Sequence, residues 1–248
     1  MEADVAARCV AAAGMRPWHT TLAVCNVIRC DPALLADLAV AAADGSMNLA
    51  LGRAAGAGRI DVVRTLLGRG ADLRACNYAL MWAAKAGHLA IVELLLGRGA
   101  NVHTWDDAAL RGAAAAGHVD VVALLLGLGA HVHARFDEAL RGAAAAGHAH
   151  VVELLLASDA DVHARGDEAL QEAARYGHGA VVELLLRRGA ISSTALLRAA
   201  DNGDVRAVRL ILDHGGTCPG YMNVALRRAS HPAVVAMLIA RGAVACAP

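Results

Sequence analysis

Aromatic residues are scarce in this chain: tryptophan, tyrosine and phenylalanine together make up 3% of its 248 residues. A β-sandwich or β-barrel of this length depends on aromatic and β-branched side chains to fill its core. The scarcity therefore argues against both architectures. Much of the 57% hydrophobic content is alanine, a small residue that favours helix and lets helices pack closely. This composition favours an all-α fold.

The chain also lacks an excess of charge of either sign. Its 23 basic and 23 acidic residues cancel, and Lys85 is the single lysine. Nucleic-acid binding requires a concentrated basic face, whereas the arginines here are scattered among carboxylates. We therefore expect no nucleic-acid partner.

An ordered cysteine pattern and a long apolar run are missing as well. The six cysteines follow neither a disulfide framework nor CxxC spacing, and free thiols indicate a reducing compartment. No run of about 18 apolar residues lacks a charged or polar break, so we expect no membrane span. The acidic start MEADVAARCV lacks the basic region of a secretory signal. These features predict an intracellular, cytoplasmic protein, of the host if the chain is viral.

Repetition dominates the rest of the sequence. The string ALRGAAAAGH occupies residues 109–118 and again 139–148. Each Gly-His pair precedes an apolar helical pattern such as IVELLLGRGA or VVELLLRRGA. The pairs recur every thirty residues, at Gly87-His88, Gly117-His118, Gly147-His148 and Gly177-His178. A period of this size indicates a stack of small supersecondary units that share one continuous core.

Each repeat is predicted to contain a short helix, a turn, a longer helix and an extended connector. In the repeat at 107–136, Leu110, Ala113 and Ala114 mark one face at helical spacing. Gly117 suits the left-handed residue that ends a helix. Aspartates stand just before the first helices, at predicted N-cap positions: Asp107, Asp137 and Asp167.

Two twenty-residue stretches share one pattern, AAKAGHLAIVELLLGRGANV (83–102) and AAAAGHVDVVALLLGLGAHV (113–132). With this pattern, the span from about 20 to 248 resembles the ankyrin repeat family. The usual TPLH opening is replaced by YALM, AALR, EALR and EALQ, and the period is thirty against about 33 in typical ankyrin repeats. The resemblance implies an all-α ankyrin-repeat solenoid with short or poorly formed β-hairpin connectors. This variant is similar to the arrays encoded by giant DNA viruses.

The repeats predict an N-terminal lead-in at 1–19 and a single ankyrin-repeat domain at 20–248. The first unit (20–47) is a degenerate N-cap and the last (223–248) a C-cap, because end units face water on one side. Six further units lie between them, at 48–76, 77–106, 107–136, 137–166, 167–191 and 192–222.

Catalytic and metal-binding motifs do not stand out. Sequences such as HExxH and GxSxG are absent, so we expect no enzyme, no cofactor and no metal. Stacked helices lie about 8–10 Å apart and Zn–N bonds measure about 2 Å, so neighbouring Gly-His histidines cannot share an ion. We expect each to bond backbone of its own or the next repeat. For a second row, at His103, His133 and His163, a solvated connector, a pH-sensitive row and a metal site stay open.

The resemblance implies a binding face made of first helices and connectors, on the concave side. The middle repeats place only Gly112, Ala116, Gly142 and Ala146 there, which fits either a smooth floor for a partner or duplication of a tolerated sequence. Around them stand residue types that often dominate interface energetics. These further candidates are Tyr78, Trp82, Lys85, Trp105, Arg111, Phe136, Arg141, Glu172, Arg175 and Tyr176.

We therefore predict a non-catalytic scaffold that binds a partner protein on this groove and its connectors, with a viral or microbial host-interaction role as one interpretation. The alternative is a structural or self-assembling repeat protein, since alanine-rich faces and zero net charge favour association. Of the two states, a monomer is favoured over a homo-oligomer.

Overall fold

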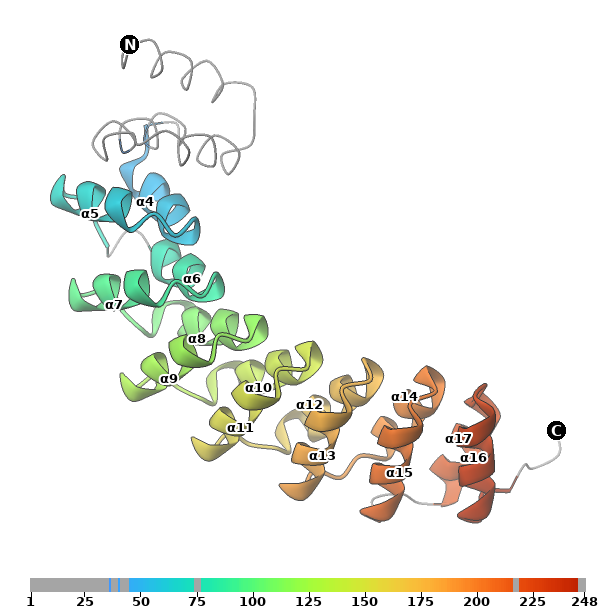
Figure 1. Cartoon of the computed structure of the whole chain (residues 1–248). Helices are drawn as coiled ribbons and strands as arrows, with labels where there is room; N and C mark the ends of the chain where they lie inside the picture. Colours follow the sequence, from blue (N-terminus) through green and yellow to red (C-terminus); the bar gives the residue numbers. More distant parts are fainter. Residues whose placement is uncertain (1–35, 37–39, 41–44, 74–76, 216–218, 245–248) are drawn as a thin grey trace, which may run out of the picture. The chain divides into compact units, whose positions relative to one another are not determined.

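The computed structural model describes residues 36, 40, 45–73, 77–215 and 219–244, and within these ranges it contains helices and no strand (Figure 1). The lead-in at 1–19, most of the degenerate repeat at 20–47 and all six cysteines lie outside the described residues. None of the described helices is long and apolar enough to cross a membrane. The chain divides into two compact units, 1–113 with 127–130 and 114–126 with 131–248.

The first compact unit is built from helix pairs in which one first helix packs on the next. Helix α4 packs against α6, and each also packs against the second helix of its own repeat. Leu51, Leu66, Ile91 and Leu95 are fully buried between them. Its helices are α4 (Met47–Gly56), α5 (Ile60–Gly68), α6 (Asn77–Lys85), α7 (Leu89–Gly97) and most of α8 (Thr104–Ala116).

The second compact unit continues the same pattern. Its first helices α10, α12, α14 and α16 contact one another in order, and so do its second helices α11, α13, α15 and α17. This unit begins with the end of α8 and with α9 (Val119–Gly127), whose last residue belongs to the first unit. Its other helices are α10 (Ala134–Ala146), α11 (Ala149–Ala157), α12 (Ala164–Arg175), α13 (Gly179–Arg187), α14 (Ser193–Asn202), α15 (Val205–Asp213), α16 (Pro219–Arg228) and α17 (Pro232–Ala240). Its core is a row of leucines flanked by alanine and valine.

Glycines in the left-handed region end both kinds of helix. Gly147 caps α10 at φ 80°, as predicted for this class of glycine, and Gly117 has φ 82°. The second helices end before Gly99, Gly129 and Gly189, at φ 89–93°. At the same place after α11 the left-handed residue is Asp159, at φ 65°. With these stops, α7, α11 and α13 have nine residues each, and α4 and α14 have ten. The prediction that the second helix is the longer one is therefore wrong.

Three connectors contain compact left-handed turns, before the first helices of α8, α10 and α12, so the prediction of an extended link is wrong for these three. Three successive residues have positive φ in each of these three turns, for example Arg135 (53°), Phe136 (59°) and Asp137 (55°). The left-handed conformation costs an L-residue roughly 1–2 kcal/mol. Tertiary contacts must therefore hold these turns in place.

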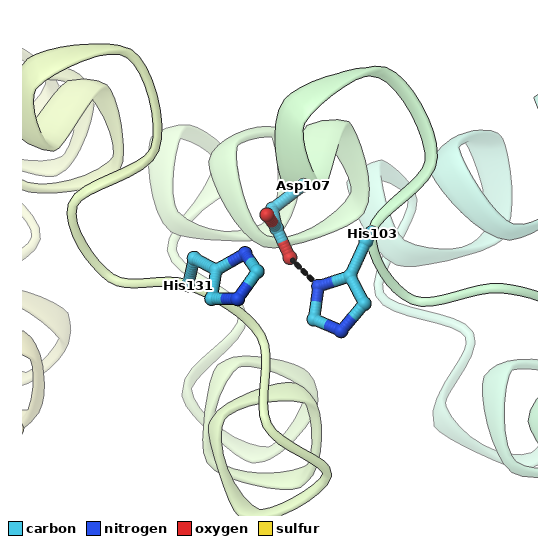
Figure 2. Close-up of side chains that lie close together, drawn as sticks. All are labelled: His103, Asp107 and His131. Atoms are coloured by element: carbon cyan, nitrogen blue, oxygen red, sulfur yellow. Dashed lines mark hydrogen bonds and ion pairs between the residues drawn. The ribbon is translucent and has the colours of Figure 1, made fainter.

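The connector aspartates supply some of these contacts. Asp137 is buried, and its Oδ1 accepts a hydrogen bond from the Asp161 N–H at 2.9 Å and lies 3.1 Å from His133 Nδ1. Asp167 likewise accepts from the Ile191 N–H at 3.2 Å. An N-cap has extended backbone and accepts from its own helix, so the N-cap prediction is wrong for these residues. Figure 2 shows the same His–Asp pair in the first unit, with His103 Nδ1 3.1 Å from Asp107 Oδ1.

Asp137→Ala tests this tie between successive connectors. The change leaves the Asp161 N–H and the His133 ring without their acceptor, so we expect the free energy of unfolding to fall by about 1–3 kcal/mol. Urea denaturation of the full chain measures it. Glu153→Ala, which removes an exposed carboxylate from α11, is the control and should cost under about 0.5 kcal/mol. Equal costs would contradict the role given to Asp137.

Candidate functional site

Three predicted site residues of the first unit form an aromatic cluster, Tyr78 and Trp82 on α6 and Trp105 in the connector turn of α8. The Tyr78 ring centroid lies 5.5 Å from that of Trp82 and 4.6 Å from that of Trp105, the latter pair edge to face. Tyr78 is 44% and Trp105 43% exposed, and Trp82 is half-buried. The fold thus joins aromatics from two repeats into one partly exposed surface.

Two glycines of α4 leave the space into which Trp82 of this cluster packs. A Cβ at Gly52 would lie 3.1 Å from the Trp82 ring, and one at Gly56 would lie 3.2 Å from the Trp82 Cβ. The two positions are four residues apart and share one helix face. Sequence reasoning assigned them no role, although this spacing ahead of a tryptophan-bearing helix was an available signal.

Gly112 and Gly142 also lie against the preceding first helix. A Cβ at Gly112 would come within 3.3 Å of the Lys85 Cβ, and one at Gly142 within 3.3 Å of the Ala115 Cβ. A glycine inside a helix costs about 1 kcal/mol relative to alanine. At these two positions the absence of a side chain lets the helix pack closely on the preceding first helix, which offsets that cost. Their use as a floor for a partner stays a prediction, as does that of Ala116, which is half-buried, and Ala146, which is exposed.

The two predicted rim arginines support the connector turns. Arg111 donates hydrogen bonds to the carbonyl oxygens of Trp105 (2.8 Å) and Asp106 (3.0 Å). Arg141 donates to the Phe136 carbonyl at 3.1 Å. Both guanidinium groups therefore stabilise left-handed backbone, and they hold in place the turns that carry Trp105 and the 71% exposed Phe136.

Glu172, Arg175 and Tyr176 lie together at the end of α12 in the second unit. Glu172 accepts a hydrogen bond from Arg198 at 2.7 Å, and its carboxylate is 3.8 Å from the Arg175 guanidinium. The Arg175 guanidinium lies 5.4 Å from the Tyr176 ring centroid, a cation–π contact. A depression of about 580 Å³ opens beside Arg175 and Arg198. Sequence reasoning missed two further charged residues that line it, Asp201 and Arg228.

Two of the Gly-His histidines, His88 and His178, bond backbone as predicted, but the partner belongs to the preceding repeat and not to the histidine's own or the next one. His88 Nε2 lies 3.2 Å from the Gly56 carbonyl oxygen, and His178 Nε2 lies 3.0 Å from that of Ala145. In the repeat at 48–76 the histidine position holds Arg59, which bonds Asp61 at 2.6 Å. This hydrogen bond holds the pKa of Asp61 below its usual value. The bonds of His88 and His178 thus join successive repeats.

Comparisons with known proteins agree with this arrangement. A family model described as three copies of the ankyrin repeat matches residues 51–136, 112–193 and 140–222. The crystal structure of the human ASB11 ankyrin repeat domain is similar, with a TM-score of 0.65 and 26% identity over 79% of this chain and 99% of that one. A comparison with curated proteins finds no match. With its repeated helix pairs and this match across more than half its length, the chain belongs to the ankyrin repeat family.

Proposed function

We propose that this protein is a non-catalytic scaffold that binds another protein through its first helices and connectors. Ankyrin repeats are generally modules of protein–protein interaction, which supports the class of function. The placement of the aromatic residues supports the choice of the first helices and connectors as the binding surface.

None of the aromatic residues that the structure describes lies in the buried core. Tyr78, Trp105, Phe136, Tyr176 and Tyr221 are exposed, and Trp82 is half-buried. All six belong to first helices, their ends or connectors. Large aromatic side chains gain much from burial and often anchor protein interfaces. The few aromatic side chains of this chain thus lie on the first helices and connectors. This distribution is typical of a binding surface made by those elements.

The cellular setting is part of the same proposal. The cysteines without a disulfide pattern favour a reducing compartment, which fits action inside a cell. If the chain is viral or microbial, a host regulatory protein is the partner we propose. Mass spectrometry of proteins captured from host lysate addresses both points.

The test replaces the two connector aromatics together, Trp105→Ala with Phe136→Ala. Because interface aromatics are frequent hot spots, we expect affinity for the captured partner to fall by about 2 kcal/mol or more, roughly thirtyfold. Pull-down identifies the partner, and calorimetry with the purified partner measures the affinity.

The matched control removes two exposed aliphatic side chains from the ends of second helices, Leu128→Ala with Ile239→Ala. It should bind as the wild type does. Equal affinity of the aromatic variant and the wild type would overturn the assignment of the surface. Capture of only further copies of this chain, with light scattering that shows oligomers, would favour the self-assembling alternative.

A further inference from the structure

Three arginines of the second unit line one depression on the first-helix side. Arg175, Arg198 and Arg228 come from α12, α14 and α16, and the depression has a volume of about 580 Å³. These helices pack side by side in this order, as Figure 1 shows. The stack of repeats therefore presents three guanidinium groups along one surface, one from each successive first helix.

Two carboxylates share these three guanidinium groups. Glu172 accepts from Arg198 at 2.7 Å and is 3.8 Å from Arg175. Asp201 accepts from Arg228 Nε at 2.7 Å and also from its Nη2. The remaining lining residues are uncharged: Thr194, Leu197 and Asn202. Asp201 belongs to the lining and Glu172 lies beside it, bonded to Arg198, so three positive groups meet two negative ones here within a chain whose net charge is zero.

The arginines keep donors for an incoming group. A guanidinium carries five N–H donors, whereas the hydrogen bonds above use one on Arg198 and two on Arg228. The side chains of Arg175 and Arg228 are 57% and 51% exposed. A carboxylate can approach each of them and accept two parallel hydrogen bonds.

We propose that this arginine depression binds an acidic segment of the partner protein, a short run of aspartate and glutamate. The inference rests on the proposed scaffold function and specifies the chemistry of the partner. Acidic side chains on a flexible peptide can bind the arginines singly and avoid Glu172 and Asp201. The dense charge of a phosphate backbone would meet both carboxylates, and nucleic-acid binding requires a stronger basic field.

The test titrates a fluorescein-labelled poly-glutamate peptide with the full chain and follows fluorescence anisotropy. The variant carries Arg175→Gln, Arg198→Gln and Arg228→Gln. We expect it to bind at least about tenfold more weakly than the wild type, and the wild type to bind more weakly as salt rises to about 0.15 M. Hydrogen exchange of the wild type should show peptide-dependent protection in α12, α14 and α16 and none in α13 and α15, which keeps the test independent of how the variant folds.

The second-helix side offers a matched control, Arg187→Gln, Arg206→Gln and Arg241→Gln. There Arg187 and Arg206 share Glu183 while Arg241 pairs with Asp213, so the same number of arginines and carboxylates is affected. This control should bind the peptide within about twofold of the wild type. An equal loss in both triple variants would show long-range charge alone and overturn the assignment.

Two further outcomes separate this inference from the scaffold function. No binding of poly-glutamate, together with a captured partner that the aromatic variant loses, would overturn the acidic segment and leave the scaffold intact. Peptide binding in the depression, with no effect of the aromatic substitutions on any partner, would keep the acidic segment and overturn the assignment of the aromatic surface. Tighter binding of a single-stranded RNA oligomer than of poly-glutamate, lost in the first triple variant, would assign the depression to phosphate and refute the proposal.

Discussion

Gly147→Ala is expected to lower the free energy of unfolding by about 2–4 kcal/mol, through two separate effects. Gly147 has φ 80°, where a side chain is strained. Its new Cβ would also lie 2.6 Å from Nδ1 of the His178 ring. The ring must move, and the bond from His178 Nε2 to the Ala145 carbonyl, 3.0 Å long, is then lost. Urea denaturation of the full chain measures the change.

Gly189→Ala separates the two effects. Gly189 has φ 93°, but a Cβ there meets no atom within 4 Å. We expect only the backbone cost of about 1–2 kcal/mol at this position. In the His178→Ala background, Gly147→Ala should cost less than it does alone, since the clashing ring is gone. Equal costs for both glycines, or additive costs with His178→Ala, would contradict the packing role of the histidine.

Leu155→Ala is expected to cost about 2–5 kcal/mol, because it leaves a cavity in a core with few large side chains. Leu155 on α11 has 0% of its surface exposed. Helix α11 packs against α10 of its own repeat and α13 of the next. Since each repeat is stabilised largely by its neighbours, we also expect unfolding to lose cooperativity around this position. The midpoint and slope of urea denaturation report both effects.

Ile191→Ala is the control for the core substitution. Ile191 is 59% exposed, so removing its side chain should change stability by under about 0.5 kcal/mol. Its backbone N–H, which donates to Asp167, is unchanged by the substitution. A similar cost for Ile191→Ala and Leu155→Ala would mean that burial does not decide the stability of this unit.

The candidate site was predictable where residue type alone decides exposure. Phe136 and Tyr176 stood out as large aromatics in a chain with few of them, and both are exposed. The arginine depression was not predictable in the same way. Its third arginine lies on α16, 53 positions after Arg175 in the sequence (228 − 175), in a repeat whose first helix is atypical. Only packing of α12, α14 and α16 side by side brings the three guanidinium groups to one surface.

Local sequence determined the helices and their ends. Leucine and alanine at helical spacing define the faces that are buried, as at Leu140 and Ala143, and glycines such as Gly147 end the helices because they alone adopt positive φ without strain. Tertiary structure decided the rest. Arg141, and the Asp161 N–H that donates to Asp137, hold the connector turn around Phe136 in the left-handed conformation. Trp82 packs closely on α4 because Gly52 and Gly56 face it without side chains. The contacts of Asp137 and Trp82 join residues 24 or more positions apart, so a short local stretch of sequence does not contain their cause.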